Sequence, residues 1–305
     1  MQVKILGSAA GGAFPQWNCA CPNCHAVRGG RFRGKARSQT QIAVSADGES
    51  WFLLGASPDL RYQIESSPEL HPRSGTRSSP VSGVILASAD LDHVLGLLLM
   101  RELQPLRVWA AESVIKILRD DNSMFRMLNR IADQVQWQTI RAGEPFSLPP
   151  RTEVSSSIGC RAVAVSPHYP AYATGVQVSE EVVMGLVLTA PSGATMGFFP
   201  QLAQLTPELK SVFATLDCLL LDATFWSDDE LIRLQGFGQQ AREMGHVPVG
   251  GEDGTLQQLG GLSTPRKMYI HINNTNPMLN EAGAEYRAVR DAGWELAEDG
   301  CHFTL

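Results

Sequence analysis

The fold of this chain is decided by residues 83–93, which read GVILASADLDH. The first five of these residues are apolar, and such a short run is typical of a strand buried on both faces of a parallel sheet. The six residues that follow begin where this strand ends, and most of them are polar. Loops at the carboxyl end of a parallel strand commonly bind ligands, because the strands hold them rigidly. We therefore expect an α/β protein with functional residues at this edge.

The rest of the chain repeats this alternation of short strands and helices. Further strands are predicted at Val3–Leu6, Gln41–Ser45, Trp51–Leu54, Arg107–Ala110, Arg161–Val165, Val182–Thr189, Thr195–Phe199, Cys218–Asp222 and Lys267–Ile272. A closing hairpin is predicted from Trp294–Ala297 and Cys301–Leu305. Helical spacing predicts helices at Val94–Leu103, Glu112–Leu128, Gln204–Val212, Asp228–Leu234 and Asn280–Ala292. Interleaved strands and helices predict one layered α/β domain over residues 1–305, with the helices outside.

Polar residues recur at the carboxyl ends of these strands. They are Asp59, Ser88–His93, Ser166–His168, Asp222 and His271. A single acid or histidine at a strand end is usually structural. Five such places in one chain favour a shared site, because convergent polar clusters mark reaction centres.

Composition excludes several classes of protein. The 305 residues are 44% hydrophobic and 18% charged, which is enough to bury a sizeable core. A net charge of −6 argues against nucleic-acid and anionic-membrane partners. No apolar run approaches a membrane span, and the first residues lack a secretory signal. Scattered single cysteines at Cys160, Cys218 and Cys301 fit buried free thiols in a reducing cytoplasm.

Half of the six cysteines lie within six residues: Cys19, Cys21 and Cys24. Cys19 and Cys21 are too close to form a disulfide without strain, whereas thiolate sulfur suits tetrahedral zinc. A structural zinc site needs four ligands, and no fourth cysteine is nearby. Unmetallated thiols are the alternative interpretation.

At the strand end quoted above, the chain resembles the metallo-β-lactamase superfamily. The superfamily pattern there is His-x-His-x-Asp-His, which supplies ligands to two metals. In this chain Ser88 and Asp90 replace the first two histidines, and Asp92 and His93 remain. The resemblance implies a four-layer αββα sandwich. The two replacements argue against a two-zinc hydrolytic centre and favour a single iron or manganese ion. The alternative is an inactive site or a structural Asp–His pair.

The metal ligands that come later in the superfamily pattern are matched to this sequence one at a time. Its bridging acid matches Asp222 and its last histidine matches His271. Its middle histidine matches His168 loosely, and an exposed loop histidine is the alternative there. His246 follows a glycine after a predicted helix, so it is either a site residue or a capping histidine.

Several longer segments are similar to the family of coenzyme PQQ synthesis protein B. They lie in the family's order along nearly the whole chain: residues 7–19 (GSAAGGAFPQWNC), 56–59 (ASPD), 92–93 (DH), 222–226 (DATFW), 228–230 (DDE), 242–246 (REMGH) and 271–277 (HINNTNP). The resemblance implies a role in the biosynthesis of pyrroloquinoline quinone (PQQ). It implies an iron-dependent oxidoreductase that hydroxylates the tyrosine ring of a Glu–Tyr-derived intermediate. A carrier that moves PQQ or its precursor to the periplasm is one alternative, and a metallo-hydrolase is another.

The resemblance also suggests metal ligands. Asp92, His93 and His271 are the expected Fe²⁺ ligands, by analogy with sites of two histidines and one carboxylate. Asp222 and His246 are extra ligands, anchors or proton carriers. For the zinc, a related branch uses a histidine three residues after the last active-site histidine, and here that position is Asn274. His271 itself is the other main candidate for the fourth zinc ligand, and water or a side chain from elsewhere in the chain, such as His25 or His302, is the further alternative. The expected partner is the small PQQ precursor or PQQ, and a homodimer is kept open.

Overall fold

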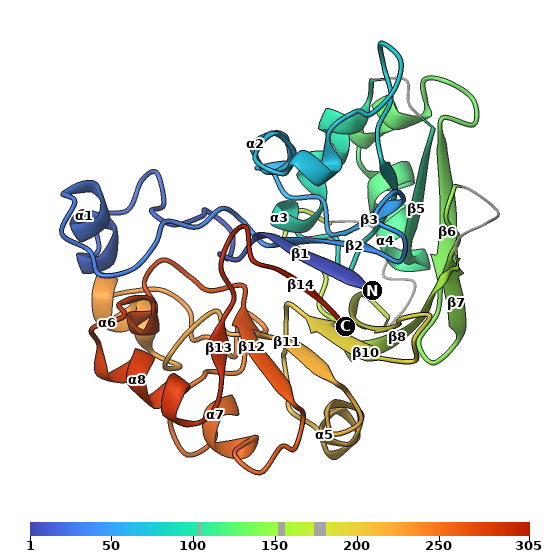
Figure 1. The fold of residues 1–305 in the computed structure, drawn as a ribbon. Helices are drawn as coiled ribbons and strands as arrows, with labels where there is room; N and C mark the ends of the chain where they lie inside the picture. Colours follow the sequence, from blue (N-terminus) through green and yellow to red (C-terminus); the bar gives the residue numbers. More distant parts are fainter. Residues whose placement is uncertain (103–104, 152–155, 174–180) are drawn as a thin grey trace. The chain divides into compact units, whose positions relative to one another are not determined.

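The computed structural model describes residues 1–102, 105–151, 156–173 and 181–305 (Figure 1). These residues form two compact units, each built from separated stretches of the chain. The first unit contains Met1–Leu6, Gln41–Ala194 and Gly300–Leu305, and the second contains Gly7–Thr40 and Thr195–Asp299. The single domain expected over residues 1–305 stays a prediction. Among the described stretches, no helix combines the length and the apolar character that crossing a bilayer requires.

The first unit is built on a seven-stranded sheet in the order β14-β1-β2-β3-β4-β5-β6. Strands β3 to β6 run parallel to one another, while β14 is antiparallel to β1 and β2 is antiparallel to β3. Every residue of β2, β3 and β4 is buried, which explains why their sequences are mostly apolar. The strands are β1 Gln2–Gly7, β2 Gln41–Ser45, β3 Trp51–Leu54, β4 Val81–Ile85, β5 Leu106–Ala111, β6 Val135–Ile140 and β14 His302–Thr304.

An antiparallel group in the order β9-β8-β7 completes the strands of the first unit. Its members are β7 Pro145–Leu148, β8 Ile158–Ser166 and β9 Val183–Thr189. The sequence signals missed β6 and β7. In both strands only the last residue is buried and the others are exposed or half-buried, and such strands carry a weaker apolar signal than fully buried ones.

The helices of the first unit are short. They are α2 Leu60–Glu65, α3 Leu91–Val94 and α4 Glu112–Lys116, with 3₁₀ turns at η1 Pro68–Leu70, η2 Leu95–Met100 and η4 Phe125–Asn129 and a π turn at η3 Ile117–Asp121. The continuous helices predicted over Val94–Leu103 and Glu112–Leu128 are therefore wrong, and Leu103 lies outside the described residues. Close packing explains the first break. A Cβ atom on Gly96 would lie 2.3 Å from the Ser57 carbonyl oxygen, so the tight turn runs directly against the chain at residues 56–57.

The second unit contains four parallel strands in the order β13-β12-β11-β10. They are β10 Thr195–Phe199, β11 Cys218–Asp222, β12 Arg266–Ile270 and β13 Glu295–Leu296, drawn in yellow to red in Figure 1. The helices of this unit are α1 Pro22–Arg28, α5 Pro207–Phe213, α6 Glu230–Gln235, α7 Thr255–Gln258, α8 Ala284–Asp291 and the 3₁₀ turn η5 Pro277–Leu279.

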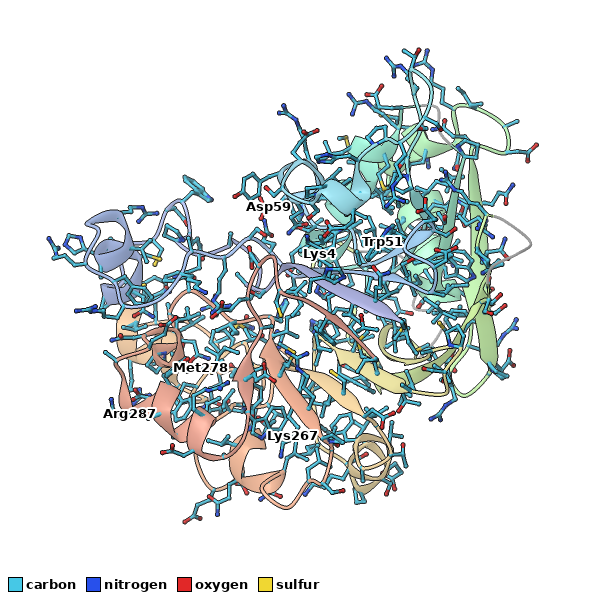
Figure 2. All side chains as sticks on the ribbon, viewed as in Figure 1. Lys4, Trp51, Asp59, Lys267, Met278 and Arg287 are labelled. Carbon is cyan, nitrogen blue, oxygen red and sulfur yellow. The ribbon has the colours of Figure 1, made fainter. Side chains whose placement is uncertain are left out.

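Most apolar side chains of the strands are buried, and most charged side chains of the helices are exposed to solvent. In Figure 2, Trp51 of β3 is one of the fully buried side chains of the first unit, whereas Arg287 projects from the exposed face of α8 in the second. Tyr269 of β12 stacks on Trp294, with ring centroids 4.1 Å apart. These contacts bury the apolar faces that drive folding.

The closing hairpin predicted from the sequence is wrong. Strand β13 pairs in parallel with β12, with Met268 opposite Glu295. Strand β14 pairs in antiparallel with β1 instead, with Gln2 opposite Thr304. Two strands separated by a short Gly-containing loop favour a hairpin locally, but each of these strands finds a better partner in its own unit.

The register of β11 and β12 positions the chemistry of the second unit. Asp222 is opposite Ile270 in this parallel pair, so both strands end at the same edge. The residue after Ile270 is His271, which therefore follows its strand at the level where Asp222 ends the neighbouring one. The sequence prediction that strand ends bring these two residues together agrees with this register.

Candidate functional site

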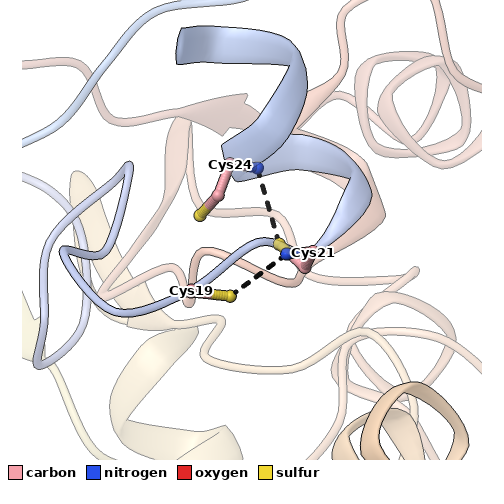
Figure 3. Close-up of side chains that lie close together, drawn as sticks. All are labelled: Cys19, Cys21 and Cys24. Carbon is pink, nitrogen blue, oxygen red and sulfur yellow. Dashed lines mark hydrogen bonds between the residues drawn. The ribbon is translucent and has the colours of Figure 1, made fainter.

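Cys19, Cys21 and Cys24, which belong to the second unit, surround one small space (Figure 3). Their sulfurs all lie within 4.8 Å of one another. Hydrogen bonds from backbone N–H groups to two of the sulfurs stabilise the turn that brings the cysteines together. Cys21 N–H donates to Cys19 Sγ at 3.4 Å, and Cys24 N–H donates to Cys21 Sγ at 3.5 Å. Cys21 is the residue that caps α1, and Pro22 takes the first helical position, where no backbone N–H is needed. The local sequence therefore folds the sulfurs into a cluster.

Asn274 lies against all three sulfurs. Its Nδ2 atom is 3.1 Å from Cys19 Sγ, 3.6 Å from Cys21 Sγ and 3.3 Å from Cys24 Sγ. The side-chain amide of Asn23 donates to the Asn274 and Asn276 carbonyls at 3.1 and 3.0 Å, which anchors this loop to α1. Of the two sequence-derived candidates for the fourth position, the structure places Asn274, not His271, beside the sulfurs.

The donor set of this cluster fits a zinc ion. Burial raises the pKa of Cys21 to about 11. Burial also acts to raise the pKa of Cys19, but hydrogen bonds from the Cys21 N–H and neighbouring side chains outweigh it and lower that pKa. The Cys21 thiol therefore stays protonated at neutral pH unless a cation stabilises its thiolate. A divalent cation is the group that stabilises three adjacent thiolates, and the Asn274 amide oxygen is a further donor on the same side chain.

Replacement of Asn274 tests its place at the fourth corner. Asn274→His is expected to raise zinc affinity because imidazole is a regular fourth ligand, and Asn274→Ala to lower it about tenfold, or ~1.4 kcal/mol. Competition with a coloured chelator measures both. Asn122→Ala, whose side chain only caps Met124 N–H in the first unit, is the control. Equal zinc affinities in all four proteins would remove Asn274 from the site.

A second cluster lies at the ends of β11 and β12. Asp222 is completely buried, and its two carboxylate oxygens accept four hydrogen bonds. Oδ1 accepts from the Thr224 N–H at 3.0 Å and the Thr224 hydroxyl at 2.7 Å. Oδ2 accepts from Leu202 N–H at 3.0 Å and from His246 Nδ1 at 2.7 Å. A carboxylate has about four acceptor positions, so protein donors occupy those of Asp222.

Two imidazoles complete this cluster. The Nδ1 of His271 lies 2.8 Å from Thr224 Oγ1, and the Nδ1 of His246 lies 3.0 Å from the same oxygen. Because the Thr224 hydroxyl donates to Asp222, both imidazoles act as Nδ1–H donors, which leaves the lone pair of each ring on Nε2. The rings are stacked with centroids 5.5 Å apart. This is the arrangement in which proteins present histidine to a metal.

The two imidazoles keep the Asp222 carboxyl group ionised. Its burial would raise its pKa, but His246 and His271 outweigh that effect, so the pKa of Asp222 lies well below its ordinary value. The carboxylate is thus ionised and orients the two rings. A ligand atom of each of Asp222, His246 and His271 lies within 4.8 Å of the others. Because protein donors already occupy the Asp222 carboxylate, the two imidazoles are the groups of this cluster that would bind a metal ion, and Asp222 orients them.

His271 has a left-handed backbone, with φ of +58°. Such a conformation costs on the order of 1 kcal/mol in a residue other than glycine. Its neighbours fix it: the Ile272 N–H donates to Ser8 O at 3.0 Å, and the Asn273 N–H donates to Thr224 O at 3.0 Å. Strain at the end of β12 therefore directs the His271 ring toward Thr224.

The first unit carries the residues of the quoted motif. Ser88 Oγ donates to Asp90 Oδ2 at 2.9 Å and lies 2.9 Å from His93 Nδ1. His93 is buried, and its Nε2 lies 4.0 Å from Asp92 Oδ2. Ser88 Oγ accepts a hydrogen bond from His93 Nδ1, which leaves the ring lone pair on Nε2. Thr224 has the same role toward His271. Ser88 and Asp90 bond to each other and to this histidine.

The remaining predicted residues fall into two groups. His168 is exposed after β8, which agrees with the loop interpretation. Asp92 and His93 belong to the first unit and His271 to the second, so the predicted iron set of these three residues stays a prediction. Sequence reasoning gave no role to Thr224, although an acid followed two residues later by threonine is a known signal of a local side-chain turn.

Comparison with known proteins identifies the class. Residues 50–272 match the model of the beta-lactamase superfamily domain, so the chain is a member of that superfamily. A diphosphatase of the PhnP family shares the fold, with 16% identity, a TM-score of 0.67, and 100% of this chain and 97% of that one covered. The predicted α/β metallo-β-lactamase fold is confirmed.

Within that superfamily, the chain belongs to the coenzyme PQQ synthesis protein B family. It is 37% identical to the protein of that name from Methylococcus capsulatus and 40% identical to that from Methylorubrum populi, with both chains fully covered in each case. The crystal structure of Zn²⁺-bound PqqB from Methylobacterium extorquens gives a TM-score of 0.91 at 38% identity over the full length of both chains. The family resemblance inferred from the sequence is confirmed.

Proposed function

We propose that this protein acts in PQQ biosynthesis as an iron- and O₂-dependent hydroxylase of the tyrosine ring in the Glu–Tyr-derived precursor. The names of its full-length relatives support the pathway. One observation carries the chemistry: at both strand ends, imidazoles are held through Nδ1 by hydroxyl or carboxylate oxygens, in the manner of metal ligands.

Two metals have different roles in this proposal. Zinc is held by Cys19, Cys21, Cys24 and Asn274 and stabilises the loop before α1, and the Zn²⁺-bound relative supports that metal. Fe²⁺ suits the carboxylate and imidazole groups at the strand ends, since harder oxygen and nitrogen donors favour it over thiolate. Iron, when bound, supplies the activation of O₂.

The chain's own residues prepare this chemistry. Thr224 and Asp222 fix the rings of His246 and His271 in one tautomer and one orientation. Ser88 does the same for His93. Preorganised ligands need no rearrangement when a metal and a substrate arrive, so less binding energy is lost to ordering. The Asp222 carboxylate keeps a proton on Nδ1 of His246.

The structure supports the two alternative functions, a metallo-hydrolase and a carrier, less well. A two-metal hydrolase needs the two histidines that Ser88 and Asp90 replace, and an acid with open acceptor positions between the metals. Asp222 instead accepts four hydrogen bonds from protein groups. A carrier for PQQ or its precursor needs a tight binding site without turnover, and no observed group favours it over catalysis.

Oxygen uptake tests the proposal directly. The zinc-loaded protein is reconstituted anaerobically with Fe²⁺ and mixed with O₂ and the dicarboxylated tyrosine precursor. Substrate-dependent oxygen consumption with a hydroxylated product is expected. Tight PQQ binding without oxygen uptake would replace the proposal with the carrier function, and cleavage of a phosphodiester with Zn²⁺ alone would replace it with the hydrolase.

Loss of His93 is expected to remove iron binding. His93→Ala takes away a buried imidazole whose Nδ1 is already fixed, so Fe²⁺ affinity should fall at least about 100-fold, with loss of oxygen uptake. Equilibrium dialysis under argon measures the affinity. His168→Ala is the matched control, since that histidine is exposed. A His93→Ala protein with full iron content and activity would exclude His93 as a ligand.

A further inference from the structure

The loop after β12 carries one residue of each cluster in the second unit. His271 takes part in the imidazole cluster, and Asn274, three residues later, lies against the cysteine sulfurs. Any shift of this loop would move both residues. The groups that hold the loop therefore decide whether both clusters keep their geometry.

Glu230 is one of these groups, although neither cluster includes it. It begins α6, and its side chain is buried. One carboxylate oxygen, Oε1, accepts from the Thr275 hydroxyl, and the other, Oε2, accepts from the Trp226 N–H at 2.7 Å. Thr275 in turn accepts from the Asn273 side-chain amide at 2.6 Å. Glu230 thus ties the loop after β12 to the segment that follows Asp222 and Thr224.

A buried carboxyl group is costly unless it is paired. Burial raises the pKa of Glu230 to about 7 despite the hydrogen bonds that it accepts. Glutamine would carry less of this cost and would still bond to both partners: its amide oxygen would accept from the Trp226 N–H, and its NH₂ group would donate to the Thr275 hydroxyl oxygen. The position of Glu230 therefore needs a reason other than stability.

We propose that Glu230 is a positioning residue that tethers the loop after β12 and so maintains both the three-cysteine site and the imidazole site. The tether works through hydrogen bonds to Thr275 and Trp226, which lie on the two segments that bear the clusters. Removal of a hydrogen-bonding group behind a metal ligand lowers metal affinity on the order of 10-fold to 100-fold. Here one side chain, that of Glu230, supports both the three-cysteine site and the imidazole site.

Three variants test the tether. Glu230→Ala removes both hydrogen bonds, and Glu230→Gln keeps a side chain that can bond to both partners. Asp229→Ala is the control, because Asp229 is exposed and forms an ion pair with Arg233 on the surface of α6. Cobalt replaces zinc at the cysteines, and its thiolate charge-transfer absorption reports affinity there. Dialysis of zinc-loaded protein against Fe²⁺ reports the imidazole site.

Glu230→Ala is expected to weaken both metals on the order of 10-fold, while Glu230→Gln and Asp229→Ala stay close to the parent protein. Unchanged affinities in Glu230→Ala, a loss at only one site, or equal losses in Glu230→Ala and Glu230→Gln would each overturn the tether.

If Glu230→Ala does not fold, a second pair of variants makes the same comparison. Thr275→Ser keeps the hydroxyl that donates to Glu230, and Thr275→Val removes it. The inference rests on the proposed function only for the iron. Failure of the parent protein to bind iron would count against that function and against a tether of the imidazole site, and the cobalt measurement would still decide whether Glu230 supports the cysteine site.

Discussion

The Cys24→Ala protein is expected to purify without zinc at the cysteine site and to lose the fixed structure of the loop before α1. Cys24 is completely buried, and its sulfur lies 3.3 Å from the Asn274 amide. Two thiols cannot hold zinc as tightly as three, since each thiolate both binds the ion and offsets its charge. A structural zinc contributes on the order of 10 kcal/mol to the folding of a zinc-finger peptide. The loss here is smaller, because β10 to β13 and their helices provide a core of their own.

Zinc content by atomic emission and limited proteolysis between residues 12 and 36 measure this result. Cys160→Ala is the matched control, since Cys160 is also buried but lies on β8, far along the chain from the cluster. Burial raises the pKa of that thiol to about 12, which makes it an inert side chain. A Cys24→Ala protein that keeps its zinc and resists the protease as the parent does would show that the cluster is not a metal site.

Asp222→Asn is expected to lower the free energy of unfolding by about 3–5 kcal/mol, because it leaves more than one buried donor without an acceptor, at a cost of about 1–3 kcal/mol for each. Asparagine has nearly the same shape, but it supplies one acceptor oxygen and an NH₂ group. It therefore cannot accept from Leu202 N–H, Thr224 and His246 together, and buried donors lose their partners. With the imidazoles no longer fixed, affinity for a metal at this cluster should fall as well.

Urea unfolding measures this free energy. The control is Asp217→Asn, since exposed Asp217 accepts from Thr195 N–H and its hydroxyl at 2.8 and 3.0 Å, and exposed sites change stability by about 0.5 kcal/mol or less. Equal unfolding midpoints for Asp222→Asn and the parent protein would contradict the assignment of Asp222 as a charged anchor.

Buried strands were predictable because a strand that is buried on both faces is mostly apolar in sequence. The predicted Gln41–Ser45, Trp51–Leu54, Thr195–Phe199 and Cys218–Asp222 coincide with β2, β3, β10 and β11. The helices were less predictable. Helical spacing marks which residues face the core, but it does not tell an α-helix from successive 3₁₀ and π turns, as residues 112–129 illustrate.

The site residues were predictable as types and positions, but not as partners. Cysteine spacing indicated a metal cluster, whereas the choice between His271 and Asn274 depends on how a loop some 250 residues later packs against α1. The roles of Thr224 and Glu230 depend on hydrogen bonds between loops that follow different strands. Such contacts leave no local pattern, since any serine, threonine or acid could make them.

The second unit joins Gly7–Thr40 to Thr195–Asp299, and this sets an order of events during synthesis. Cys19, Cys21 and Cys24 leave the ribosome before the whole central stretch, and Asn274 and β10 to β13 follow only after it. At about 5–20 residues per second, roughly 10–50 s separate Cys24 from Asn274. During that interval three neighbouring thiols are exposed to oxidants and to competing metals. A newly made chain is therefore most sensitive to zinc supply and to oxidative stress before its C-terminal part exists.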